Sequence, residues 1–128
     1  MSVSYVTVER GILNDPAAPK KTYAQAKSSG EVTFRNLVKE IAEGSTTVSD
    51  TDALAVLNDL TKILRRHLEE GRIVRFGDFG TFQVSIKSKG AETPEKFNAA
   101  LIHSPKIAFR PGADLRAMLK NLKYTKVK

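Results

Sequence analysis

The chain has 128 residues, which is the size of one ordinary domain. Its 41% hydrophobic and 27% charged residues are typical of a globular protein and exclude a disordered one. The sequence contains no cysteine, which excludes disulfide bridges and thiolate metal sites and fits a reducing compartment. It contains no apolar run long enough to span a membrane, and its first nine residues lack the pattern of a secretory signal, so we expect a cytoplasmic protein.

Charge is unevenly distributed along the chain, whose formal net charge is +7. Residues 1–30 carry a net charge of +2, residues 31–70 carry −3, and residues 71–128 carry +8. A basic half of this size favours a polyanionic partner, either nucleic acid or an anionic surface.

Residues 1–30 have the pattern of a two-stranded extension. Val3, Tyr5, Val6 and Val8 stand among small polar residues, which predicts a short strand. Two prolines and an Asn-Asp-Pro sequence mark residues 11–21 as a loop, and residues 23–27 are expected to form a second strand before a break at Gly30.

Residues 31–70 have the apolar spacing of two helices. Thr33 is placed to cap the first helix and Gly44 to end it. Ser49 is placed to cap the second helix, which ends at Gly71. The apolar stripe of this second helix is too wide for one short companion helix to cover, which favours a partner surface. We expect Leu57, Leu60 and Leu64 to lie near that interface.

After Gly71 the apolar period changes to two, which predicts strands. Residues 76–80 form a turn, and alternation through Phe82, Val84 and Ile86 predicts a half-buried strand. The alternation is lost over residues 87–105, which we interpret as a mobile excursion, and it resumes at Ile107. The sequence then predicts a last helix over residues 113–122 and a tail with several lysines and no acid.

Two motifs in this order resemble the signatures of the bacterial histone-like HU and integration host factor family. The first stands here as Gly-Asp-Phe-Gly-Thr-Phe at residues 77–82, with Asp78 inserted, and the second as Phe-Arg-Pro-Gly at residues 109–112. The resemblance covers about residues 31–122, and the additional residues 1–30 are similar to those of extended HU-related proteins of Bacteroidetes-type bacteria. It implies an α+β fold with two N-terminal helices, a three-stranded antiparallel sheet with an extended β-arm, and a C-terminal helix. The expected domains are an N-terminal β extension over residues 1–30 and an HU-like domain over residues 31–128, with the arm at about residues 87–106.

The glycines and aromatic residues of these motifs have structural reasons. Gly77 and Gly80 allow a sharp turn, while Phe79 and Phe82 are expected to fill the core beneath it. Pro111 is expected in the first turn of the last helix, with Arg110 beside the positive end of that helix.

The family resemblance also implies an intertwined homodimer whose two arms embrace duplex DNA from the minor-groove side. In that family a proline within an Arg-Asn-Pro triplet wedges between base steps at each arm tip. This arm lacks that triplet, contains no arginine, and has a net charge of only +2, with Pro94 close to Glu92 and Glu95. The DNA-binding residues expected by resemblance are Lys87, Lys89, Pro94, Lys96, Lys106, Arg110, Arg116 and Lys120.

Enzymatic interpretations lack supporting residues. Residues 78–80 spell the kinase metal-binding triplet Asp-Phe-Gly, but the other kinase motifs are absent. Residues 77–80 also match a KH-type loop, which joins helices, whereas this segment joins strands. His67 and Glu70 share a helix face, but two ligands do not make a zinc site. We therefore expect a protein that is not an enzyme and needs no cofactor, metal or small-molecule substrate.

Three functions remain open from the sequence. The first is sequence-tolerant duplex DNA binding as a histone-like, nucleoid-associated homodimer that condenses DNA. The second is an HU-fold protein-interaction module with weak or lost DNA binding that uses the N-terminal strands for its contacts. The third is binding of another polyanion such as RNA. Salt-dependent retention of duplex DNA separates the first from the second, and competition with RNA separates the first from the third.

Overall fold

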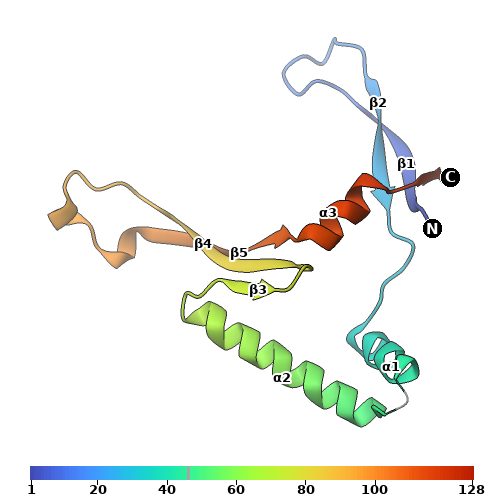
Figure 1. Cartoon of the computed structure of the whole chain (residues 1–128). Coiled ribbons are helices and arrows are strands. Elements are labelled where there is room, and N and C mark those ends of the chain that lie inside the picture. Colours follow the sequence, from blue (N-terminus) through green and yellow to red (C-terminus); the bar gives the residue numbers. More distant parts are fainter. Residues whose placement is uncertain (46) are drawn as a thin grey trace.

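The computed structural model describes residues 1–45 and 47–128 and has a mixed α+β architecture, which confirms the predicted class (Figure 1). Three α-helices and two three-stranded sheets form an open shape rather than a compact one (Figure 1). The strands are β1 (Val3–Arg10), β2 (Lys21–Lys27), β3 (Val74–Phe76), β4 (Gly80–Ser88), β5 (Ile102–Pro111) and β6 (Tyr124–Lys126). The helices are α1 (Phe34–Gly44), α2 (Asp50–Glu69) and α3 (Ala113–Lys120), with short 3-10 helices η1 (Pro94–Lys96) and η2 (Ala99–Leu101).

The two predicted helix caps are confirmed. The Thr33 hydroxyl accepts a hydrogen bond from the backbone N–H of Asn36, at 3.2 Å, and so satisfies an unpaired donor at the start of α1. At the start of α2, the Ser49 hydroxyl accepts a hydrogen bond from the backbone N–H of Asp52, at 3.1 Å. Gly71 follows α2 with a φ of +82°, a conformation that favours glycine and turns the chain toward β3.

Strands β3, β4 and β5 form an antiparallel sheet with one apolar and one polar face. Val74, Phe82 and Phe109 lie in one row across the three strands, and the ring centroids of Phe82 and Phe109 are 4.9 Å apart. Val84 and Ile107 lie on the same face and line a shallow hollow with Leu68 of α2. Because strand side chains alternate between faces, the residues between these positions lie on the other side of the sheet.

The arm is more regular than the sequence predicts. The expected loss of strand structure over residues 87–105 is wrong at both ends, because β4 and β5 stay paired as far as Ser88 and Ile102, while residues 89–101 lie outside the strands and include η1 and η2 at the tip. The pairing register shifts between Ser85 and Lys87, and Ser104 on the opposite strand has a φ of +52°. Pro105 follows it and has no N–H to give to the ladder, so a bulge is the place that tolerates it. Because of this bulge, apolar and polar residues do not alternate strictly along the sequence of β5.

The two glycine motifs contact one another. The Gly112 N–H donates to the Phe79 carbonyl at 2.8 Å. A Cβ atom on Gly80 would lie 2.6 Å from the Arg110 carbonyl oxygen, so neither motif tolerates a side chain where they meet. The expected position of Pro111 is wrong: it ends β5 opposite Gly80, and Gly112 is the N-cap of α3.

The second sheet has the strand order β2-β1-β6 and joins both ends of the described chain. The β1–β2 hairpin has the two strands that the sequence predicts, with Arg10 opposite Lys21 at its loop end. The tail was expected only as a lysine-rich extension, yet residues 124–126 pair in parallel with β1, and α3 ends at Lys120 rather than residue 122. The Ser2 and Thr125 hydroxyls add a hydrogen bond of 2.6 Å.

The apolar core of a single chain is very small. Among residues 1–45 and 47–128, Val38 of α1 and Ala53 of α2 are the only buried hydrophobic residues. The expectation that Phe79 fills a core is wrong for one chain, because this side chain is 48% exposed although it contacts Phe76 and Phe109. No second layer covers the apolar side of the turn in one chain, so its aromatic residues remain in contact with solvent.

Candidate nucleic-acid interface

The polar face of the β3-β4-β5 sheet carries a row of basic side chains. Arg75 and Arg110 both pair with Thr81, so the three residues lie side by side across the sheet. Lys106 pairs with Ser85 on the same face. Lys87 follows Ser85 by two residues along β4 and therefore lies on this face too. We call Arg75, Lys87, Lys106 and Arg110 the arm face.

The basic groups of the arm face are exposed and free to meet an anion. In the described part of the chain the ion pairs are Arg72–Glu70 and Lys96–Glu92, and neither involves the arm face. The other residues on this face include no aspartate or glutamate: they are Thr81, Gln83, Ser85, Ala108 and His103. Exposed cations without acidic neighbours retain their full attraction for phosphate groups.

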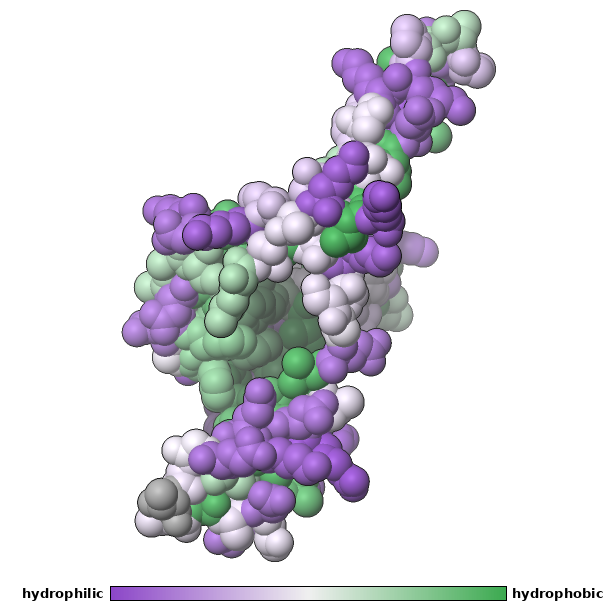
Figure 2. All heavy atoms as spheres, turned by 90° about the vertical axis from the view of Figure 1, so that its right-hand side faces the viewer, coloured by the Kyte–Doolittle hydropathy of each residue, from purple (hydrophilic) through white to green (hydrophobic). Residues whose placement is uncertain are grey.

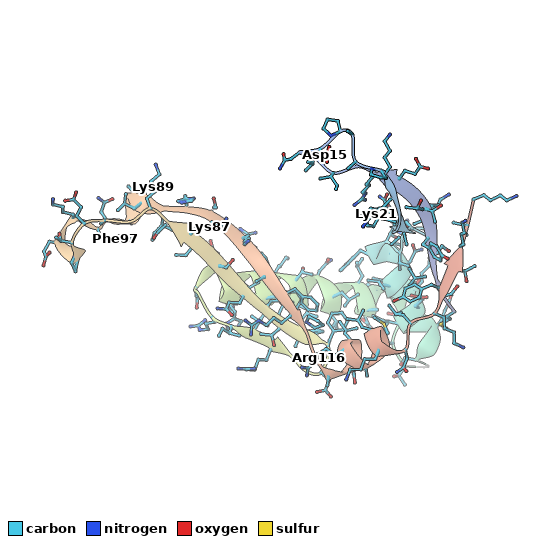
Figure 3. All side chains as sticks on the ribbon, turned by 90° about the horizontal axis from the view of Figure 1, so that it is seen from above. Asp15, Lys21, Lys87, Lys89, Phe97 and Arg116 are labelled. Atoms are coloured by element: carbon cyan, nitrogen blue, oxygen red, sulfur yellow. The ribbon has the colours of Figure 1, made fainter. Side chains whose placement is uncertain are left out.

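The arm tip is less favourable for an anion. Figure 3 shows Lys87 and Lys89 along the arm and Phe97 at its end. The Lys89 N–H donates to the Leu101 carbonyl at 2.9 Å, which places Lys89 at the base of the tip. Lys96 donates to Glu92 at 3.0 Å, so its charge is partly neutralised within the arm. Pro94 begins η1 beside Glu92 and Glu95, and Phe97, 42% exposed, is the largest apolar side chain of the tip.

Helix α3 carries the remaining predicted site residues at the base of the arm. Figure 3 shows Arg116 on this helix, and Lys120 lies one turn later. The Asp114 N–H donates to the Asp78 carbonyl at 3.2 Å, which fixes the start of α3 against the turn between β3 and β4. The structure therefore brings Lys87, Lys106 and Arg110 onto one sheet face, and it places Lys89, Pro94 and Lys96 at the tip and Arg116 and Lys120 on a separate element.

Arg75 belongs to this site but was not among the predicted residues. It lies on the three-residue strand β3, directly opposite Thr81, which pairs on its other side with Arg110. Pairing across the turn at residues 76–80 would have predicted this position, because alternation places Arg75 and Thr81 on the same face.

His67 and Glu70, which share a helix face in the sequence like two ligands of a metal site, both contact an arginine. Arg72 contacts both His67, with 3.0 Å between its Nη1 and the ring Nδ1, and the carboxylate of Glu70. Within the residues that the structure describes, no group of three or more His, Asp or Glu side chains is arranged to hold a metal ion. No described helix is long and apolar enough to cross a membrane.

Comparison with known proteins identifies the fold. The model of the family HU-HIG, described as "HU domain fused to wHTH, Ig, or Glycine-rich motif", matches residues 1–126. The chain belongs to this family. No curated protein matches it in sequence.

Two solved structures show the same fold as this HU-HIG chain. One is a candidate bacterial DNA-binding protein from Bacteroides vulgatus, with a TM-score of 0.68, 12% identity, and coverage of 98% of this chain and 48% of that chain. The other is HU from Anabaena in a cocrystal with DNA, with a TM-score of 0.51, 21% identity, and coverage of 66% of this chain and 94% of that chain. This chain thus spans about half the length of the Bacteroides protein. About a third of this chain lies outside the match to Anabaena HU.

Proposed function

We propose that this chain binds duplex DNA as a sequence-tolerant, histone-like homodimer associated with the nucleoid. The observation that carries the proposal is the arm face, where four basic side chains line one side of a sheet and no acidic residue interrupts them. The membership of the HU-HIG family and the fold shared with an HU that was crystallised with DNA support it.

Homodimer formation is supported by the surface that one chain leaves uncovered. The chain exposes 11053 Å². A compact protein of 14.1 kDa exposes about 6,700 Å². Figure 2 shows apolar residues around a hollow in one side of the molecule, between the upper part of the view and the lower part. Exposed apolar side chains come from every element of the HU-like region, including Phe34, Leu37, Ile41, Leu54, Ile63, Phe76, Phe79, Phe109, Met118 and Leu119. A second copy of the chain would remove this surface from water.

Tolerance of DNA sequence is supported by the type of contact that the arm face offers. Lysine and arginine side chains that reach phosphate oxygens position a protein on DNA but carry no information about the bases. Each phosphate that they neutralise releases counterions, so the affinity is expected to fall steeply as the salt concentration rises. The family membership favours DNA over RNA as the polyanion, and a competition experiment decides between them.

The test is a gel-shift titration on two duplexes of unrelated sequence, each at two salt concentrations. The arm variant is K87Q/K106Q/R110Q. The helix variant R35Q/K39Q/K62Q removes the same charge from exposed positions on α1 and α2 and serves as the matched control. We expect the arm variant to weaken binding to both duplexes about equally and to reduce the salt dependence, while the helix variant behaves like the wild type.

Three results would contradict the proposal. Wild-type protein that retains no duplex at low salt would favour the protein-interaction module. Equal binding by the arm and helix variants would show that the arm face is not the site. Preferential displacement of duplex DNA by RNA would favour RNA as the polyanion that the chain binds.

A further inference from the structure

One face of the β1–β2 hairpin carries hydrogen-bond donors and cations beside the half-buried Val6 and Val8. The register pairs Arg10 with Lys21, Val8 with Tyr23, Val6 with Gln25 and Ser4 with Lys27, so these side chains share a face. We call the five exposed residues of this set the hairpin face: Arg10, Lys21, Tyr23, Gln25 and Lys27. All of them are exposed, and Tyr23 is 46% exposed.

Two positive charges lie directly opposite one another at the loop end of this face. Like charges in a directly opposed pair destabilise a hairpin. Among the described residues, neither Arg10 nor Lys21 forms an ion pair with a carboxylate that would offset the repulsion. A bound anion between the two side chains would turn this unfavourable pair into a favourable one.

The opposite face of the same hairpin has a different composition. It carries Tyr5, Thr7 and Glu9 from β1 and Thr22, Ala24 and Ala26 from β2, with Lys126 of β6 beside Tyr5. Within the two hairpin strands, the basic residues lie on one face and the acidic residue on the other. This segregation indicates a surface for an anionic partner.

The dimensions of the hairpin face suit a nucleic-acid backbone. Lys21 and Lys27 are six residues apart along one strand, which is about 20 Å at the rise of a β-strand. The same distance along duplex DNA is about six base pairs. Arginine, lysine, tyrosine and glutamine side chains all donate hydrogen bonds to phosphate oxygens.

The hairpin and the arm are separate projections of the chain. In Figure 1 the arm extends to the left and the hairpin upward, and Figure 3 shows Lys21 on the hairpin apart from Lys87 and Lys89 on the arm. A phosphate held by the hairpin would therefore lie outside the segment that the arm face contacts.

We propose that the hairpin face is a second contact surface for the phosphate backbone of duplex DNA, outside the arms. The proposal rests on the DNA binding proposed above and adds a site to it. The hairpin holds the DNA that flanks the segment bound by the arms, and Arg10, Lys21 and Lys27 each neutralise a phosphate.

The test measures the dissociation constant by fluorescence anisotropy over a series of salt concentrations. The hairpin variant is R10Q/K21Q/K27Q, which has the same charge change as the arm and helix variants. We expect the slope of log K against log salt to become shallower by about 5 for the hairpin variant, because the proposed homodimer has two hairpins and each loses three phosphate contacts at about 0.9 per contact. The helix variant should keep the wild-type slope. The charge-retaining variant K21R/K27R should also keep it, which separates loss of charge from misfolding of the hairpin.

Hydroxyl-radical footprinting on a long duplex gives an independent readout. We expect the hairpin variant to lose protection of about six base pairs at the flanks and to keep protection at the centre. A footprint and a slope identical to those of the helix variant would overturn the hairpin proposal while the arm variant still tests the DNA-binding proposal. Absence of salt-dependent binding by wild-type protein would overturn both.

Discussion

Gly112 lies against the backbone of Asp78, so closely that a Cβ atom at position 112 would come within 2.6 Å of the Asp78 carbonyl carbon. Backbone atoms cannot move aside as a flexible side chain can. The closeness of these two residues joins the turn between β3 and β4 to the start of α3, and it explains why the second motif carries a glycine at this point.

The variant Gly112→Ala is therefore expected to lower the free energy of unfolding by about 1–3 kcal/mol through overpacking. Urea unfolding followed by circular dichroism measures this change. Gly90→Ala is the matched control, because a Cβ atom there meets nothing within 4 Å, and its stability should stay close to that of the wild type. Equal stability of the two variants would show that the turn and α3 separate without cost.

The mass in solution is expected to be that of two chains. Leu57, Leu60 and Leu64 of α2, predicted near the interface, are each half-buried in one chain and are expected to become buried in the dimer. Because association stabilises the folded state by mass action, the thermal midpoint should rise with protein concentration. Light scattering checks the mass, and the mass of a single chain at micromolar concentration would rule out the homodimer.

Lys96 is expected to contribute less to DNA binding than Lys87. Lys96 is paired with Glu92 at 3.0 Å, whereas Lys87 lies on the arm face without an acidic neighbour across the strand pair. Exposed ion pairs are worth about 0–1 kcal/mol, so Lys87→Ala should weaken binding about two- to fivefold more than Lys96→Ala. Gel-shift titration of both variants tests this.

The Glu92→Gln variant provides the converse experiment. It frees the Lys96 ammonium group and removes a negative charge from the arm, so it should bind duplex DNA more tightly than the wild type. Weaker binding by this variant would show that the ion pair holds the tip in its DNA-binding conformation.

The arm is expected to kink DNA only weakly. Insertion between base steps costs a few kcal/mol, which contacts along the bent flanks must offset. Pro94 lies beside two glutamates, so Pro94→Ala should change the affinity by less than about 1 kcal/mol. Fluorescence transfer between the ends of a short duplex measures bending. A large shortening that disappears in Pro94→Ala would contradict this expectation.

The local elements could be predicted from the sequence because each has a strong signal. Thr33 and Ser49 marked the helix starts, and the period-two pattern around Phe82 marked β4. The arm face could be predicted only in part. Lys106 and Arg110 were expected from the resemblance, but the place of Arg75 beside them depends on strand pairing across a turn, which no local pattern specifies.

Other features depend on strand pairing and packing, which the pattern of neighbouring residues in the sequence does not specify. The bulge at Ser104 breaks the alternation of β5, so the β-arm was expected from the family resemblance and not from the residue pattern. Residues 124–126 have no periodicity, and they become β6 only because β1 offers an unpaired edge. Phe79 looks like a core residue in sequence, yet it is exposed in one chain, and we expect the second chain of the proposed homodimer to cover it.

The pairing of β6 with β1 also sets an order of events during synthesis. β1 and β2 are separated by a short loop and can pair as soon as both have left the ribosome. Val3 meets Tyr124 only after the residues between them have been made, and pairings between such distant residues form slowly. Until then the second edge of β1 presents unpaired backbone groups, which are a template for association with other nascent chains. Of β1 to β6, the last strand to emerge is the one that closes this edge.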